Sequence, residues 1–183
     1  MDCLVIKGGT SLKGDVKISG AKNAALPLMA ATLLTSDECV LRNLPNLSDV
    51  QFMARILESL GASVEMNRGT IRVRARKISG FGDYDLIRKM RGSICILGPL
   101  MGRLNEAKVS MPGGCVIGAR PIDLHLKGMR DLGATVSVEG GYVHAKAKRL
   151  IGGESFLGGR CGPTVLGTAN MLMAASLAKG RTL

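Results

Sequence analysis

Aromatic residues are scarce in this chain. Its 183 residues include three Phe, two Tyr and no Trp. A hydrophobic core must therefore be built from Leu, Ile, Val, Ala and the ten Met, whose side chains interdigitate tightly. Proteins that bind single-stranded nucleic acid usually stack its bases on aromatic rings, so we expect no nucleic-acid partner.

The sequence also lacks the patterns of metal sites, export signals and membrane spans. His125 and His144 are the only histidines, and no C-x-x-C motif accompanies them, so we expect no metal and no cofactor. No signal-peptide pattern and no apolar run of about 18 residues occurs. We therefore expect a soluble, cytoplasmic protein. Cys39 and Cys95 lie within apolar runs and are predicted to be small core residues.

Positive charge is in excess, with 25 Lys and Arg against 14 acidic residues and a net charge of +11. The cations are dispersed along the chain. In the segment 71–76 the arginines alternate with apolar residues, which predicts a strand with one face in water. The excess favours a small anionic substrate, because a cleft lined by cations concentrates anions.

An internal repeat organises the sequence. Leu-Gly-Ala-Ser-Val at 60–64 recurs as Leu-Gly-Ala-Thr-Val at 132–136, which is an offset of 72. A third copy is recognisable at twice that offset, where the segment 172–177 matches the segment 28–33. The chain is therefore predicted to contain three copies of one unit with a period of 72, the third of them truncated.

Each unit is predicted to be of the βαβαββ type. It contains an apolar helix, a strand, an amphipathic helix and a hairpin, and the apolar helices must be buried because they have no polar face. The predicted fold class is therefore α/β with helices in the interior. The predicted ranges are helices at 23–34, 92–104 and 165–178, strands at 38–41 and 107–111, amphipathic helices at 49–60 and 121–132, and turns at 67–69 and 139–141.

The segment Pro112–Pro121 is the strongest candidate for chemistry. Two glycines after a proline favour a sharp turn, and Cys115 follows them. Arg120 could lower the pKa of this thiol, since a nearby cation favours the thiolate. Pro121 is suited to the first turn of a helix. These residues alone are equally consistent with an ordinary turn that carries a half-buried cysteine.

Three motifs together resemble a known family. The segments 19–27, 85–91 and 112–125 are similar to the N-terminal portion of the UDP-N-acetylglucosamine 1-carboxyvinyltransferases, and the resemblance extends over the whole chain. It implies an enzyme of two inside-out α/β barrel domains, each of three βαβαββ units around buried helices. Residues 1–21 would pack with a second domain, and residues 22–183 would form an incomplete first domain.

The resemblance also implies an activity. The family transfers an enolpyruvyl group from phosphoenolpyruvate to the 3′-hydroxyl of UDP-N-acetylglucosamine in peptidoglycan synthesis. Cys115 matches the acid of the family, which fosfomycin alkylates. The anion-binding residues match Lys22, Arg91 and Arg120, and the remaining substrate contacts match Asn23, Arg120, Pro121, Ile122, Asp123 and Leu124.

Purely structural roles are also possible for these residues. Without the resemblance, Asn23 could be a helix N-cap, Arg91 part of a solvated helix face and Arg120 a turn residue. Two alternative functions also remain. The chain could be a non-catalytic anion-binding or assembly module with a relict site. It could also be a 3-phosphoshikimate 1-carboxyvinyltransferase, although that family lacks this cysteine loop.

The last residue, Leu183, corresponds to Cys39 of the first unit. The second helix and the hairpin of the third unit are therefore missing, and one side of the helix 165–178 should face water. We expect residues 161–183 to be covered by a second copy or by the missing C-terminal part, or else to be poorly ordered. We also expect the fragment alone to be inactive.

Overall fold

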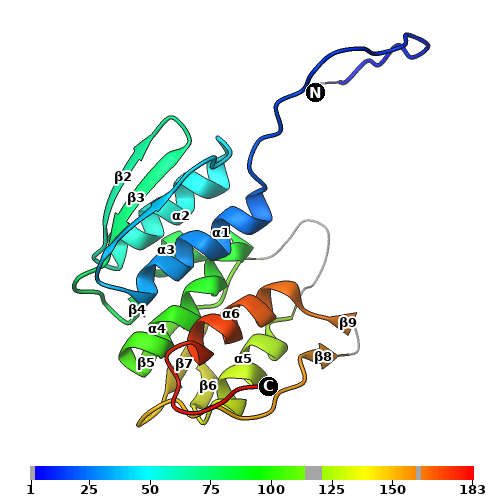
Figure 1. Ribbon diagram of the computed structural model, residues 1–183. Coiled ribbons are helices and arrows are strands. Elements are labelled where there is room, and N and C mark those ends of the chain that lie inside the picture. The colour runs from blue at the N-terminus through cyan, green and yellow to red at the C-terminus, as the bar shows by residue number, and fades with distance from the viewer. Residues whose placement is uncertain (1–2, 114–120, 160–161) are drawn as a thin grey trace.

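The apolar segments that recur along the chain form helices that pack on one another (Figure 1). The computed structural model describes residues 3–113, 121–159 and 162–183. The third helix ends at Ala175, three residues earlier than predicted, and the other two agree with prediction. These elements are α1 (Lys22–Ala31) with η1 (Thr32–Leu34), η2 (Arg91–Ile96) with α4 (Leu97–Leu104), and α6 (Val165–Ala175).

Two of these helices, α4 and α6, pack with their backbones in close contact. A Cβ atom on Gly98 of α4 would lie 2.1 Å from the carbonyl oxygen of Asn170 on α6, so only glycine fits there. The core around this contact consists of Leu, Ile, Val, Ala, Met and one Cys. Among the described residues no aromatic side chain is fully buried, as the scarcity of aromatic residues predicts.

The first sheet has the order β1-β3-β2 and is antiparallel throughout. Its strands are β1 (Glu38–Leu41), β2 (Ser63–Asn67) and β3 (Thr70–Arg74). The predicted solvated face of β3 is confirmed, since Ile71 and Val73 are buried whereas Arg72 and Arg74 face water. These two guanidinium groups lie 3.1 Å and 3.3 Å from the carboxylate of Glu38.

The amphipathic helix α2 (Ser48–Ser59) packs against α1 and β2. Its apolar residues Val50, Ala54 and Leu57 are buried, as is Leu60 directly after it. Cys39 is half-buried on β1 and not a full core residue, because its strand lies at the edge of the sheet.

The second sheet has the order β4-β5-β7-β6, and only β4 runs parallel to its neighbour. Its hairpin β6–β7 has the register of β2–β3, with Glu139 opposite Tyr142 as Asn67 is opposite Thr70, one period of the repeat earlier. Two short helices accompany the sheet. The elements are β4 (Phe81–Gly82), α3 (Tyr84–Ile87), β5 (Glu106–Ser110), α5 (Asp123–Asp131), β6 (Thr135–Glu139) and β7 (Tyr142–Lys146).

The two units differ around their first strands. Leu41 pairs with Ile71 and Val109 pairs with Val143, so the interval from β1 to β5 is shorter than the period of the repeat. The hairpins that follow are again one full period apart. The segment between the strand and the next helix is therefore longer in the second unit, where it spans 111–122, than in the first, where it spans 42–47. This longer segment contains Cys115.

Two segments lie outside this arrangement. Residues 3–19 are exposed and extend away from the helices and sheets (Figure 1). The expectation that residues 1–21 pack with a second domain stays a prediction. The other segment connects α5 and its hairpin to α6, and it contains the short strands β8 (Gly158–Gly159) and β9 (Gly162–Pro163).

Candidate active site

Arg91 and Pro121, two of the predicted substrate-binding residues, lie together. Arg91 begins η2, and its Nη2 atom donates a hydrogen bond of 3.1 Å to the carbonyl oxygen of Pro121. The side chain is therefore directed at the segment before α5. This contact links the start of η2 to the start of α5.

A prediction about Pro121 is wrong. The sequence predicts that this proline opens the helix, but α5 begins at Asp123. The first carbonyl to accept a helical hydrogen bond is that of Ile122, which bonds to the amide of Leu126. The carbonyl of Pro121 is engaged by Arg91 instead.

Gly113 lies near the start of the segment Pro112–Pro121, and Pro121, at its other end, is bound by Arg91. A Cβ atom on Gly113 would lie 1.7 Å from the carbonyl oxygen of Arg88, so any side chain would displace the backbone. Both ends of the segment thus contact the short stretch 88–91. Cys115 and Arg120 lie outside the described residues, and the interaction between them stays a prediction.

Lys22 is the first residue of α1, and its ammonium group lies 2.9 Å from the carboxylate of Asp49. A cation at a helix N-terminus opposes the helix dipole, whereas Asp49 in the first turn of α2 is favourably placed and offsets that cost. The N-cap of α1 is Ala21, so the alternative of an N-cap role for Asn23 is wrong.

The start of α1 lies close to η2. A Cβ atom on Gly92 would lie 2.9 Å from a methyl group of Leu26, one helical turn beyond Lys22. The backbone at the start of α1, which carries Lys22 and Asn23, therefore lies near the start of η2.

The three remaining predicted residues at the start of α5 have different environments. Ile122 is buried in the core, so only its backbone is available to a ligand. Asp123 is exposed in the first turn of the helix. Leu124 is half-buried, and a Cβ atom on Gly159 of β8 would lie 3.5 Å from its side chain.

Sequence reasoning considered His125 only as a metal ligand and missed its place beside this site. The ring is buried, and its Nδ1 atom lies 3.0 Å from Nδ2 of Asn170. Burial, the largest cause, and the charge of Arg91 together lower the pKa of His125 to about 4, and the charge of Asp123 partly opposes them. The imidazole is therefore neutral at pH 7. The signal in the sequence was its position four residues after Pro121 within the third motif.

The structure describes three cysteines, Cys3, Cys39 and Cys95, and the buried one is poorly suited to nucleophilic chemistry. Burial raises the pKa of the Cys95 thiol to about 12, which leaves almost no thiolate at neutral pH. Cys39 is half-buried, and Cys3 is exposed on the extended N-terminal segment.

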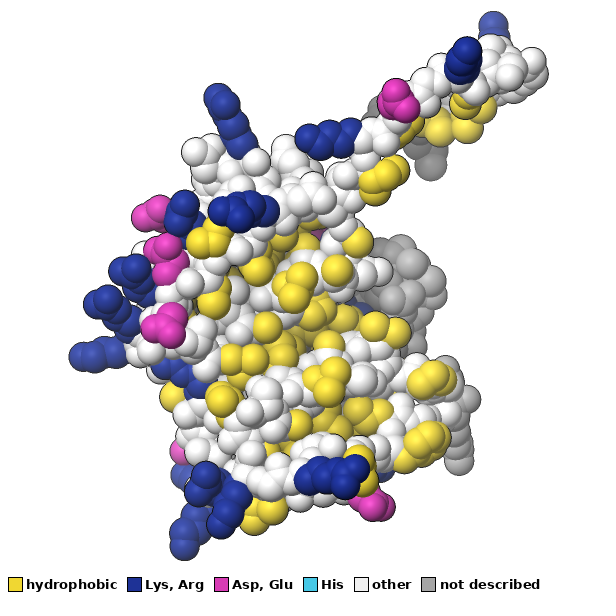
Figure 2. Space-filling view, in the orientation of Figure 1, with side chains coloured by type: hydrophobic (Ala, Val, Ile, Leu, Met, Phe, Trp, Pro, Cys, Tyr) yellow, Lys and Arg dark blue, Asp and Glu magenta, His cyan; other side chains and the backbone are white. Residues whose placement is uncertain are grey.

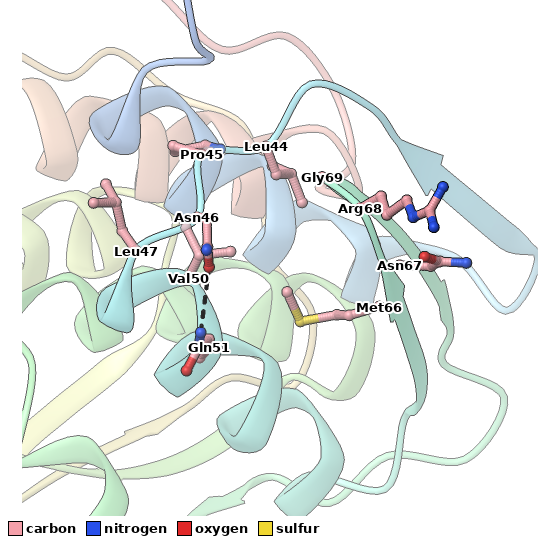
Figure 3. Close-up of a pocket in the computed structure, with 10 residues that line it drawn as sticks. All are labelled: Leu44, Pro45, Asn46, Leu47, Val50, Gln51, Met66, Asn67, Arg68 and Gly69. Atoms are coloured by element: carbon pink, nitrogen blue, oxygen red, sulfur yellow. Dashed lines mark hydrogen bonds between the residues drawn. The ribbon is translucent and has the colours of Figure 1, made fainter.

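A groove of about 340 Å³ lies between the start of α2 and the turn of the β2–β3 hairpin, and no predicted site residue lines it. Figure 3 shows Arg68 directed away from the groove, and a hydrogen bond of 3.4 Å joins Asn46 to Gln51 at its side. Within the described ranges no three His, Cys, Asp or Glu side chains converge as metal ligands. Over the same ranges no helix has the length and apolarity needed to cross a membrane.

A family model described as EPSP synthase (3-phosphoshikimate 1-carboxyvinyltransferase) matches residues 6–183. The chain belongs to this family. Within it, the chain is 52% identical over 183 residues to a UDP-N-acetylglucosamine 1-carboxyvinyltransferase of Methylacidiphilum infernorum. It is 50% and 52% identical over 184 residues to enzymes of the same name from Akkermansia muciniphila and Helicobacter pylori.

These relatives confirm the resemblance found in the sequence. The matches cover 100% of this chain but only 44%, 43% and 43% of the three relatives, so the chain spans less than half of their length.

Solved structures of the EPSP synthase family and its neighbours share the fold. The crystal structure of the enolpyruvyl transferase NikO from Streptomyces tendae matches with a TM-score of 0.77 at 22% identity, over 96% of this chain and 41% of that chain. An EPSP synthase from Acinetobacter baumannii matches with a TM-score of 0.68 at 16% identity, over 96% and 40%. The shared fold of these structures confirms the predicted α/β class.

The buried His125 predicts a dependence of stability on pH. The unfolded chain takes up a proton on this imidazole near pH 6.5, whereas the folded chain does so only near pH 4. Because the unfolded state binds more protons in that window, the free energy of unfolding should fall by roughly 3 kcal/mol as the pH drops from 6.5 to 4. Urea unfolding at a series of pH values measures this fall.

The variant His125→Gln, which does not titrate, should show a much smaller fall over the same window. His144→Gln is the matched control and should keep the full fall, since His144 lies on β7 away from this network. Equal pH dependence in the wild type and His125→Gln would contradict the assignment.

Proposed function

We propose that this chain is the N-terminal part of a cytoplasmic UDP-N-acetylglucosamine 1-carboxyvinyltransferase that acts in peptidoglycan synthesis. The observation that carries the proposal is the identity of 50–52%, across the whole chain, with relatives of that name. Identity to an EPSP synthase of known structure is only 16%, which disfavours 3-phosphoshikimate as the acceptor.

The proposed reaction transfers the enolpyruvyl group to the 3′-hydroxyl of UDP-N-acetylglucosamine and releases inorganic phosphate. Cys115 is the acid that protonates the methylene carbon of phosphoenolpyruvate. Lys22, Arg91 and Arg120 hold its phosphate and carboxylate, since such anions need preorganised cations. The nucleotide sugar contacts Asn23 and the segment 120–124. The placement of Arg91 against Pro121 supports a shared site for both substrates.

The finer architecture belongs to the same proposal. We propose an inside-out barrel domain in which three units surround α1, η2–α4 and α6, with the rest of the third unit supplied by residues beyond this chain. Figure 2 shows apolar side chains gathered over the helices on one face of the molecule. On α6, Val165 and Leu172 are 82% and 65% exposed, and Leu28 on α1 is 53% exposed.

Alkylation tests the proposed role of Cys115. Fosfomycin or a small alkylating agent at substoichiometric amounts should label Cys115 before Cys39 and Cys95, because Cys95 is buried with a raised pKa and Cys39 is half-buried. Peptide mass spectrometry after labelling identifies the site. Faster labelling of Cys39 or Cys95 than of Cys115 would show that the assignment is wrong.

Turnover tests the need for the rest of the protein. The chain alone should bind phosphoenolpyruvate and UDP-N-acetylglucosamine weakly and release no phosphate, because catalysis needs groups that converge from both sides of a closed cleft. Phosphate release is measured with both substrates, using a full-length relative as the positive control. Turnover near the rate of that relative contradicts this prediction, and absence of any binding favours a relict module.

Association tests the uncovered face of α6. Covering a few hundred Å² of apolar surface is worth several kcal/mol at about 25 cal/mol per Å², so α6 should be protected only when a partner is present. Analytical ultracentrifugation should detect self-association of the chain, or a complex with the C-terminal remainder of a close relative. Hydrogen exchange should then slow across 165–175 on association. A monomer with strong protection there and no effect of the partner would contradict the account.

A further inference from the structure

Asn170 lies at the middle of α6 with its side chain completely buried. Its amide nitrogen, Nδ2, lies 2.9 Å from the carbonyl oxygen of Ile94 and 3.0 Å from Nδ1 of His125. Its oxygen, Oδ1, accepts a hydrogen bond of 2.6 Å from the amide of Gly98. Both hydrogens of the amide group and one lone pair of its oxygen are therefore engaged.

Two of the three partners of Asn170, Ile94 and His125, belong to elements that carry or directly follow predicted substrate-binding residues. Ile94 lies in η2, which Arg91 begins, and His125 lies in the first turn of α5, directly after the segment 121–124. One amide group thus spans the distance between these elements. The hydrogen bond from Arg91 to Pro121 crosses the same junction at its outer end.

The packing leaves no freedom for this amide to move. The interval from Gly98 to Asn170 is 72, the period of the repeat, and the missing side chain at Gly98 provides the room that Asn170 occupies. The amide cannot be rotated either, because the Gly98 N–H can only donate and the Ile94 carbonyl can only accept. The orientation of Asn170 is therefore fixed from both sides.

We infer that Asn170 is a positioning residue, which sets the spacing between Arg91 and the segment 121–124 and holds His125 in the tautomer protonated on Nε2. The role in substrate binding rests on the proposed function. Nδ2 can only donate, so Nδ1 of His125 must accept and the ring proton must sit on Nε2. The lowered pKa of His125, about 4, agrees with an imidazole held neutral.

The variant Asn170→Asp keeps the size of the side chain but replaces the donor with a carboxylate oxygen. His125 must then take up a proton on Nδ1 to restore the contact, and Ile94 loses its donor. By NMR we expect the pKa of His125 to rise above 6.5 and the affinity for UDP-N-acetylglucosamine to fall about tenfold. Asn46→Asp adds the same charge at an exposed loop position and should change neither quantity.

A measurement on the wild-type chain keeps the test independent of the folding of any variant. In the ¹⁵N-labelled chain, a coupling across the hydrogen bond should join Asn170 Nδ2 to His125 Nδ1, and the ring proton should be on Nε2. A ring proton on Nδ1 would overturn the inference. If the wild type binds UDP-N-acetylglucosamine and Asn170→Asp binds it with the same affinity, the positioning role alone is overturned. If His125 has the predicted tautomer but the wild type does not bind UDP-N-acetylglucosamine, the proposed function is overturned instead.

Discussion

The hydrogen bonds of Asn170 are the constraint on which the candidate site depends. A fully buried amide must satisfy its polar atoms, and each unsatisfied partner costs about 1–3 kcal/mol. Asn170 meets this requirement only when η2, α4 and α5 all lie in their observed places, since Ile94, Gly98 and His125 come from these three elements. Aliphatic packing brings the helices together, and these directional bonds fix how they are placed.

From that junction the geometry of the site follows in short steps. With η2 and α5 fixed, Arg91 reaches the carbonyl of Pro121, while Gly113 lies against the carbonyl of Arg88. The segment 111–122 is thereby held at both ends by one short stretch of chain. The early position of β5 within its unit supplies the extra length of this segment. A repeated scaffold thus carries one non-repeated segment, and that segment contains Cys115.

The sequence predicted much of the fold because periodicity is local. Apolar spacing predicted the amphipathic helix α2, and the turns at 67–69 and 139–141 located both hairpins. Contacts between distant residues were not predictable in this way. Nothing in a local pattern indicates that Asn170 bonds to Gly98, or that Arg91 donates a hydrogen bond to the carbonyl of Pro121. The half-burial of Cys39 depends likewise on the strand order. Lys22 and Arg91 were predicted by resemblance, and His125 became visible only with its neighbours.

We propose that substrates bind where α1, η2 and α5 begin. Chemical-shift mapping of the ¹⁵N-labelled chain during titration with UDP-N-acetylglucosamine tests it most directly. The account predicts that the largest shifts fall on Asn23, Arg91 and the amides of 122–124, with little change on the outer faces of the two sheets. Shifts concentrated on the exposed arginines of β3 or the lysines of β5 and β7, with none at these helix starts, would contradict it.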